Sequence, residues 1–538
     1  MADRPSTLES LRLAFSSWRL AAVSLLSFSS GLPLGLIVTA IPFWMQQRGI
    51  DIRSIGLITL AQAPYTFKFL WSPLMDRFAP RKGRKRVWVG IGQVLLAVSI
   101  AGLALQARQP TVAAVAVLAL VISFSSATQD IAIDAYTVEV LRKDEQGLAV
   151  GARVALYRVA MYVSGAIVVS LGPTIGWGTV FAGLGVLFLA LLPISVLAPE
   201  PEVTPPPPAS LREAVWEPFV SFFRHPRALE IASFLFLYKI SNNVAEALVR
   251  PFLGELGYNA FDVGVATGTV SLLATLGGTF LGGILSQAWG VGRALWIFGV
   301  VQALAHGGYA VVAMVGVNRP VMYLAMTLES GAIGLGTGAF NVLLLRLTQR
   351  RFSATQYALF SSIFALGRTV AGPPAGILIA ALGWRDFFLL TIPMALPGLL
   401  LLQRFVPLGA REIPTLPEEI SDETTAKVGR PLPLATLAWR GILGAVVCSA
   451  AFLLVSATLV ALRGMHGGQG AFDVSGAMAT LLHPARIGDY LDLLGPVVAG
   501  LVMGFAWAAF LAARHGVART RGAGPPRSRH RPHLGPPL

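Results

Sequence analysis

The chain has 538 residues, of which 54% are hydrophobic and only 13% are charged. Soluble globular proteins carry about 25% charged residues, so this composition excludes an ordinary soluble protein. Many apolar runs reach the length of about 20 residues that crosses a bilayer, which indicates a polytopic membrane protein. The net charge of +15 does not require a nucleic-acid partner, and we expect none, because Lys and Arg gather in alternate loops. The single cysteine, Cys448, excludes a disulfide framework and a cysteine-based metal site. We expect no other metal site and no cofactor.

Six membrane helices are expected in the first part of the chain, at about residues 20–45, 54–74, 87–107, 111–140, 146–171 and 178–198. Basic residues crowd the loop after the second of these and the end of the fourth, whereas the first, third and fifth loops are poor in them. This distribution predicts that the N-terminus is cytoplasmic.

A connector at 199–227 contains a stiff proline run and then an amphipathic stretch, Leu211 to Phe223. We expect Phe219, Phe222 and Phe223 of this stretch to lie on the inner membrane surface. Six more helices are expected at about residues 228–254, 261–289, 292–315, 320–347, 353–381 and 385–405, and two additional ones at about 436–462 and 491–513. The tail is rich in Arg, Gly and Pro, so we expect it to be disordered and cytoplasmic.

The predicted organisation has six parts. They are an N-terminal six-helix bundle at 1–198, the connector at 199–227, a C-terminal six-helix bundle at 228–406, a cytoplasmic linker at 407–433, two additional transmembrane helices at 434–514 and the basic tail at 515–538. Both termini are expected in the cytoplasm.

The two blocks of six helices look like repeats. Pro42 and Pro251 are 209 residues apart, Arg158 and Arg368 are 210 apart, and the pairs Gly176-Trp177 and Gly383-Trp384 are 207 apart. The segment 72–76 has a weaker echo at 283–287. A near-constant offset between several landmarks predicts the duplication of a six-helix unit.

Asp130 and Asp134 lie four residues apart in the 111–140 helix, so they share one helical face. At 1.5 Å per residue from Arg142 they lie about 18 and 12 Å deep, where a carboxylate facing hydrocarbon costs roughly 2.5–3.5 kcal/mol. Both must therefore face a polar interior. That interior is either a transport pathway or a set of buried helix–helix contacts.

Other buried charges avoid the third and sixth helices of each repeat, which are expected to stand outside the central cavity. They are Arg153 and Arg158 in 146–171, Lys239, Glu246 and Arg250 in 228–254, Glu329 in 320–347 and Arg368 in 353–381. This is the distribution expected of side chains that line a polar pathway. His306, alone in the 292–315 helix, is expected to be a packed core histidine.

Substrate contacts are expected at Asp130, Arg158, Lys239, Asn243 and Arg368. An arginine fork suits a carboxylate, so Arg158 either binds an acidic substrate or pairs with Asp134. Lys239 either contacts the substrate or forms an ion pair with Asp130 or Asp134, and both can hold if that pair breaks as the halves rock. Asp134, Glu246 and Glu329 are the candidates for proton coupling, because a carboxylate moved between buried and paired settings can take up and release a proton.

A gate is expected at the inner surface. Asp76, followed by the basic loop Gly83 to Arg86 that includes Arg84, can pair with a neighbouring helix end and hold the cytoplasmic face closed. Glu139 lies near the same surface and is interpreted as a topological or gating residue. The plain alternative for the basic loop is that it only sets topology.

Several motifs together resemble those of the AmpG-type muropeptide permeases of the major facilitator superfamily and of the related acetyl-CoA transporter branch. The matching stretches are 28–34 (FSSGLPL), 68–77 (KFLWSPLMDR), 127–135 (ATQDIAIDA), 157–158 with 164–165, 237–239 (LYK) and 352–356 (FSATQ). The segment 241–246 departs from the family pattern, which leaves the exact substrate open.

The resemblance implies an all-α major facilitator superfamily fold, with two six-helix bundles and two extra C-terminal helices. It also implies a monomeric multi-pass importer in the bacterial inner membrane that brings anhydro-muropeptides into the cytosol together with protons, for peptidoglycan recycling. The alternatives are a transporter of another anionic solute, such as acetyl-CoA, or a membrane sensor that does not transport. We expect no enzyme, since no nucleophile–base or metal constellation is found in the sequence.

Overall fold

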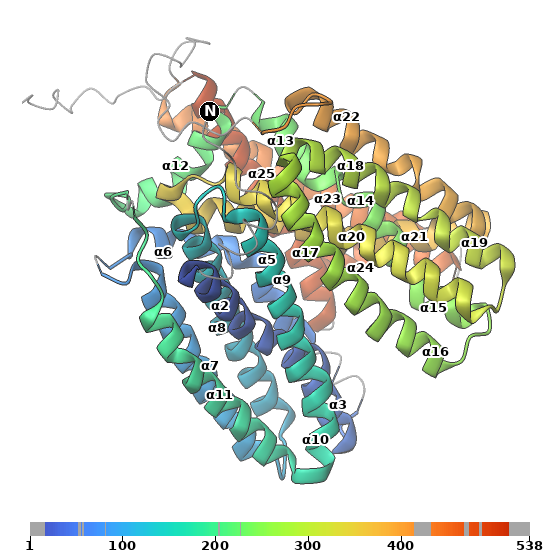
Figure 1. Ribbon diagram of the computed structural model, residues 1–538. Coiled ribbons are helices and arrows are strands. Elements are labelled where there is room, and N and C mark those ends of the chain that lie inside the picture. The colour runs from blue at the N-terminus through green and yellow to red at the C-terminus, as the bar shows by residue number, and fades with distance from the viewer. Residues whose placement is uncertain are drawn as a thin grey trace, which may run out of the picture. The chain divides into compact units, whose positions relative to one another are not determined.

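The computed structural model describes residues 17–51, 55, 59–80, 82–202, 205–225, 227–413, 432–466, 473–483 and 487–515. Most of the expected linker and nearly all of the expected basic tail lie outside these residues. The chain falls into two compact units, Met1–Pro218 with His225–Glu419, and Phe219–Arg224 with Ile420–Leu538. The first unit holds both six-helix blocks, which we call the N-terminal and C-terminal halves (Figure 1).

The N-terminal half contains the first six expected spans (Figure 1). Its helices are α2 (Trp18–Gly35), η1 (Leu36–Ala40), α3 (Ile41–Gln47), η2 (Thr59–Gln62), α5 (Ala63–Phe67), η3 (Lys68–Leu70), α6 (Ser72–Arg77), α7 (Arg84–Gln106), α8 (Val112–Val140), α9 (Gln146–Tyr162), η4 (Val163–Ile167), α10 (Val168–Ile175) and α11 (Trp177–Leu197). The segments η1 and η4 are π-helical turns inside otherwise continuous spans.

The span expected at 54–74 is not one continuous α-helix. Pro64 and Pro73 stand in the first turns of α5 and α6. A proline lacks the backbone N–H that continues a helix but is tolerated at its first positions, so each proline starts a new short helix. Lys68 lies in the 3₁₀ turn between the two.

The C-terminal half follows the connector helix α12 (Leu211–Phe223). Its helices are α13 (Ala228–Leu237), α14 (Ile240–Glu246), α15 (Val249–Glu255), α16 (Ala260–Gly264), η5 (Val265–Val270), α17 (Ser271–Trp289), α18 (Val291–Ala305), α19 (Gly307–Val315), α20 (Arg319–Leu347), η6 (Arg350–Phe352), α21 (Ser353–Thr391), η7 (Pro393–Ala395) and α22 (Leu396–Phe405). The span expected at 228–254 is broken at Tyr238 and Lys239. Helix α21 runs through the boundary expected at Gly383, but Gly383 itself has φ 75° and ψ 168° and kinks it there.

Eleven helices among the described residues are long and apolar enough to cross a membrane. The segments at 59–77 and 228–255 are not among them, because both are divided into helices of ten residues or fewer.

The duplication predicted from the offsets recurs in the packing at the helix ends. The Trp177 indole N–H donates to Gln47 at 3.1 Å, and Phe181 packs against both Trp177 and Trp44. The counterparts, each 207 or 208 residues later, are Trp384, Glu255, Phe388 and Phe252. In both repeats the tryptophan follows a glycine with positive φ, Gly176 or Gly383, a conformation that a side chain disfavours.

The two halves meet along a few helix pairs. Helix α9 of the N-terminal half packs on α17 and α20, and α21 of the C-terminal half packs on α8 and α6. At the α9–α17 contact Gly147 and Gly283 face each other, and a Cβ on Gly283 would lie 2.1 Å from the Gly147 carbonyl oxygen. This close approach requires glycine.

The second unit is a helical hairpin of α23 (Leu434–His466) and α25 (Ile487–His515), joined through α24 (Val474–Leu482), a helix that the sequence analysis did not anticipate. The last turn of α12 belongs to this unit. Phe219 and Phe223 are buried there in edge-to-face contacts with Phe505 and Phe510, and Phe222 is buried as well. The prediction that these three rings lie on the membrane surface is therefore wrong, because all three are buried and α25 covers Phe219 and Phe223.

Candidate functional site

Four charged side chains form an acid–base cluster in the N-terminal half. Its members are Lys68, Asp130, Asp134 and Arg153. Lys68 donates to Asp130 at 2.5 Å and to Asp134 at 3.3 Å. Arg153 donates to the other oxygen of Asp134. Asp130 and Asp134 thus lie on one face of α8, as their spacing predicts, and two cations balance their two charges.

Polar groups around the cluster hold it in place. Ser30 donates to Asp130 at 2.8 Å, and Tyr65 donates to Ser126, one turn of α8 away, at 2.8 Å. Tyr357 of α21 interacts electrostatically with all four members of the cluster. Since α21 belongs to the C-terminal half, the acid–base cluster lies where the two halves meet.

Lys68 is the member of this cluster that the analysis of buried charges missed. The signal was present, because a lysine inside an expected membrane span is itself an intramembrane ionisable residue. The sequence analysis considered Arg158 and Lys239 as partners of the two aspartates, and Lys68 stands in their place. Asp134 pairs with Arg153 and Lys68 instead of Arg158, and neither Asp130 nor Asp134 pairs with Lys239.

A second set of predicted residues lies between the halves. Arg158 of α9 interacts electrostatically with Arg368 and Glu246 of the C-terminal half. Arg158 is partly exposed, and Arg368 and Glu246 are exposed. Asn243 lies one turn from Glu246 on α14, next to Gly367 of α21. Two guanidinium groups and one carboxylate that interact electrostatically leave an excess of positive charge at this position.

Lys239 is buried at the break between α13 and α14. Its ammonium donates to Gln302, to the Thr337 hydroxyl at 3.2 Å and to the Ile333 carbonyl at 3.3 Å. All three acceptors are neutral, so the three donors of an ammonium are used while its charge has no direct partner among them.

Glu329 lies inside the C-terminal half, apart from the acid–base cluster. Its side chain is fully buried, and one carboxylate oxygen is 3.4 Å from Nε2 of His306. His306 is buried, as expected of a core histidine, but it faces polar groups. The three proton-coupling candidates, Asp134, Glu246 and Glu329, therefore occupy three different surroundings.

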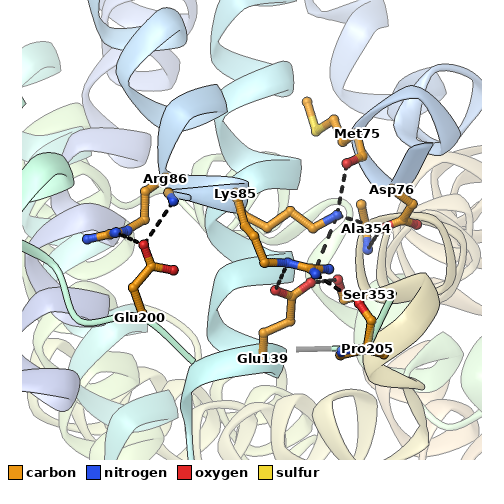
Figure 2. Close-up of polar contacts among 11 residues, drawn as sticks. Met75, Asp76, Lys85, Arg86, Glu139, Glu200, Pro205, Ser353 and Ala354 are labelled. Carbon is orange, nitrogen blue, oxygen red and sulfur yellow. Dashed lines mark hydrogen bonds and ion pairs between the residues drawn. The ribbon is translucent and has the colours of Figure 1, made fainter. Parts of the chain in front are cut away.

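Asp76 joins α6 of the N-terminal half to the start of α21 (Figure 2). Its two carboxylate oxygens accept from the backbone N–H groups of Ala354 and Thr355 at 3.1 and 2.9 Å and from the Thr355 hydroxyl at 2.7 Å. These groups form the N-terminus of α21, where free N–H groups and the helix dipole favour an anion. Lys85 donates to the same carboxylate at 2.6 Å, and both side chains are completely buried. The predicted pairing of Asp76 with a neighbouring helix end is present.

Glu139 joins the same contact. It accepts from the Ser353 hydroxyl at 2.6 Å and lies 3.2 Å from the Arg84 guanidinium (Figure 2). We call Asp76, Arg84, Lys85, Glu139 and the α21 N-terminus the first clasp, since it joins the N-terminal half to α21 of the C-terminal half.

A second clasp joins the start of α9, in the N-terminal half, to α17 and α20 of the C-terminal half. Gln287, at the end of α17, accepts from the Gly147 N–H at 3.2 Å, and Arg346 donates to Gln146 at 3.3 Å. Residues 146 and 147 start α9, the repeat counterpart of α21. The second clasp is therefore the pseudo-symmetric partner of the first, with a neutral amide where the first has a buried carboxylate.

The connector is tied to the basic loop. Arg86 pairs with Glu200, whose carboxylate also accepts from the Gly83 N–H at 2.8 Å, and Arg84 donates to the Pro205 carbonyl at 2.9 Å (Figure 2). Hydrogen bonds from Arg142 and Arg19 hold the pKa of the exposed Glu202 carboxyl at about 2, so it stays ionised at neutral pH. The basic loop thus has structural partners in the connector.

Residues 23–372 match the model of the Major Facilitator Superfamily. The chain belongs to this superfamily. It is 39% identical over 391 residues to the anhydromuropeptide permease of Escherichia coli strain K12, an alignment that covers 72% of this chain and 80% of the permease. The chain is therefore a multi-pass membrane transporter of small molecules and not an enzyme.

Solved structures agree on the fold. The human organic anion transporter MFSD10 (TETRAN) aligns with a TM-score of 0.54 at 15% identity, over 72% of this chain and 99% of that one. The proton:xylose symporter XylE, bound to 6-bromo-6-deoxy-D-glucose, aligns with a TM-score of 0.53 at 13% identity, over 73% and 97%. The superfamily fold, predicted from the motifs, is confirmed.

Proposed function

We propose that this chain imports anhydro-muropeptides, N-acetylglucosaminyl-anhydro-N-acetylmuramyl peptides, across the bacterial inner membrane together with protons. The observation that carries the substrate is the 39% identity to a permease named for it, over most of both chains. The buried charges at the meeting of the two halves support a pathway for a polar, charged solute.

The excess positive charge between the halves suits the carboxylates of a peptide. Arg158 and Arg368 offer planar donor forks to them, and Asn243 offers an amide to sugar hydroxyls. Lys239 and Asp130 complete the proposed binding set. The acid–base cluster is balanced and the Arg158–Arg368 pair is not, so the pair is the better site for an incoming anion.

Proton coupling is assigned to Asp134, Glu246 and Glu329. An ionised carboxylate in a low-dielectric interior is stable only with a partner, so a carboxylate that loses its cation takes up a proton. For Asp134 the cations are Lys68 and Arg153, and both belong to spans that contact the C-terminal half.

Both clasps lie at the ends of helices beside the Arg- and Lys-rich loops. By the positive-inside rule this side is cytoplasmic, as are both termini. The structure is then closed toward the cytoplasm, and import requires the release of both clasps as the halves rock.

The proposal is tested with the purified chain in proteoliposomes loaded with unlabelled anhydro-disaccharide peptide. Labelled peptide added outside should exchange inward, and excess unlabelled muropeptide should abolish the exchange while acetyl-CoA leaves it unchanged. Competition by acetyl-CoA alone would favour another anionic solute. The absence of exchange with either compound would favour a sensor that does not transport.

A further inference from the structure

The C-terminal half contains a buried histidine–carboxylate pair that the binding site does not use. His306 lies between α18 and α19 and Glu329 lies on α20, and both side chains are inaccessible to solvent. Nε2 of His306 is 3.4 Å from Oε1 of Glu329. Among the described residues, neither oxygen of Glu329 nor this nitrogen has another hydrogen-bond partner.

The tautomer of His306 follows from its other neighbour. The Ser241 hydroxyl donates its proton to the Thr391 carbonyl at 2.8 Å, and Nδ1 of His306 lies 3.3 Å from the same hydroxyl oxygen. Since the hydroxyl proton is engaged and His306 also has a hydrogen bond with the Thr391 backbone, we assign the ring proton to Nδ1. In the neutral imidazole Nε2 is then an acceptor, and it is aimed at Glu329.

This arrangement requires one more proton between Nε2 of His306 and the Glu329 carboxylate. With a neutral acceptor facing an ionised carboxylate, two lone pairs would oppose each other in a dry interior and the charge would have no direct partner. A proton between them removes both problems, either as a carboxylic acid that donates to Nε2 or as an imidazolium paired with a carboxylate.

The titratable groups that interact with this pair come from two elements, α14 and α19. Lys239, at the start of α14, interacts electrostatically with both His306 and Glu329, and Glu246, on the same helix, interacts with Glu329. Tyr309, on α19, also interacts with Glu329. The Lys239 ammonium, whose three acceptors are neutral, is the counter-charge available when the proton leaves.

The pair is linked mechanically to the proposed binding site. Ser241, which orients His306, lies two residues after Lys239, and both follow the break in the span 228–255. A movement of α14 therefore shifts the Lys239 ammonium and the Ser241 hydroxyl, which orients His306, at the same time.

We propose that His306 and Glu329 share one exchangeable proton and that this pair is the protonation site of the C-terminal half, with His306 as the positioning partner of Glu329. The inference rests on the proposed proton-coupled transport. In the cycle one proton binds the pair from the outer side and leaves it toward the cytoplasm, and no other bond forms or breaks.

Glu329→Gln and His306→Gln test the proposal, with Glu202→Gln as an exposed carboxylate control. In proteoliposomes both test variants should retain exchange of labelled anhydro-disaccharide peptide and lose the accumulation driven by a proton gradient, whereas the control keeps both. Accumulation that survives in either test variant would overturn the proposal. Ser241→Ala, which removes only the orienting hydroxyl, should shift the pH midpoint of accumulation, and an unchanged midpoint would also count against it.

A second readout needs no substrate. In an infrared titration of the native full chain, the shared proton should give a band, either the C=O band of a carboxylic acid or the ring band of an imidazolium, that is absent from Glu329→Gln and titrates at a different pH in His306→Gln. An identical band in the native chain and Glu329→Gln would overturn the shared proton. This titration decides the inference even if native proteoliposomes do not exchange muropeptide, a result that would instead refute the proposed substrate.

Discussion

Lys68 explains how a single membrane helix tolerates two carboxylates one turn apart. Its ammonium lies between Asp130 and Asp134, and Arg153 takes the remaining oxygen of Asp134. Removing one partner from a buried charge pair costs about 3–5 kcal/mol, because the other charge is left uncompensated, whereas removing both can be neutral.

Lys68→Met should therefore abolish uptake and lower the free energy of unfolding by about 3–5 kcal/mol. The double variant Lys68→Met, Asp130→Asn should regain most of that stability without regaining uptake, because it removes the charge that Lys68 neutralised. Thermal unfolding in detergent measures the stability and vesicle uptake measures the activity. A double variant less stable than the single one would contradict this account of the cluster.

Asp76→Asn should loosen the first clasp. Hydrogen bonds to a charged group contribute about 1.5–3 kcal/mol each, so the loss of the charge should raise the open population by about tenfold or more. In a chain with Cys448→Ser and Ala358→Cys, a water-soluble maleimide should label the new, buried cysteine faster when Asp76→Asn is added. Glu202→Gln in the same background should leave labelling unchanged, and equal rates in all three chains would contradict a gate at Asp76.

At this scale the sequence predicted that Asp76 pairs with a helix end, without choosing the helix, and it missed the partners of Asp130 and Asp134. Asp76 was expected at a helix end because the acid and the basic loop are adjacent in the chain. The partners of Asp130 and Asp134 come from two other spans, so no spacing could choose Lys68 and Arg153 over Lys239 and Arg158.

The two buried lysines, Lys68 and Lys239, both lie at interruptions of expected membrane helices. Lys68 and Lys239 each lie where a span is divided into short helices, and both are buried. The sequence predicted each span as continuous, since hydropathy over 20 residues does not register an interruption of one turn. Pro64 and Pro73 signalled the first break, whereas no residue of 236–240 is a helix breaker.

The glycines of α17 provide a test at the scale of the helix pair. Gly283→Ala should destabilise the protein by about 1–3 kcal/mol, because its Cβ would overlap the Gly147 carbonyl and force α9 away. Gly277→Ala, on the same helix with open space around its Cβ, should be neutral or stabilise by up to about 1 kcal/mol. The unfolding temperature of Gly283→Ala should therefore lie below that of Gly277→Ala. Similar values for the two variants would mean that α9 and α17 are not in close contact.

For the whole molecule, the duplicated fold gives two clasps, the first with a buried carboxylate, Asp76, and the second with a neutral amide, Gln287, in the equivalent place. The offsets of 207 to 210 residues predicted the duplication from sequence, and the paired aromatic clusters of Trp177 and Trp384 support it. The second clasp was not predicted, because Gln287 and Gly147 carry no charge to draw attention to them.

A chain that ends at Ile413 tests whether the first unit transports without the rest. It keeps Arg411 and Glu412, which bond to Gly292 and Arg346 of the C-terminal half. We expect uptake to persist with a lower unfolding temperature, because Phe219 and Phe223 lose their cover on α25. A folded truncated chain without uptake would assign a role in transport to the second unit.

The central claim is proton-coupled import through the acid–base cluster, and uptake by energised vesicles tests it most directly. Labelled anhydro-disaccharide peptide is supplied to vesicles that contain the native chain or Asp134→Asn, with and without an uncoupler. We predict accumulation by the native chain that both the uncoupler and the substitution abolish. Accumulation that is equal in Asp134→Asn and the native chain would contradict the claim.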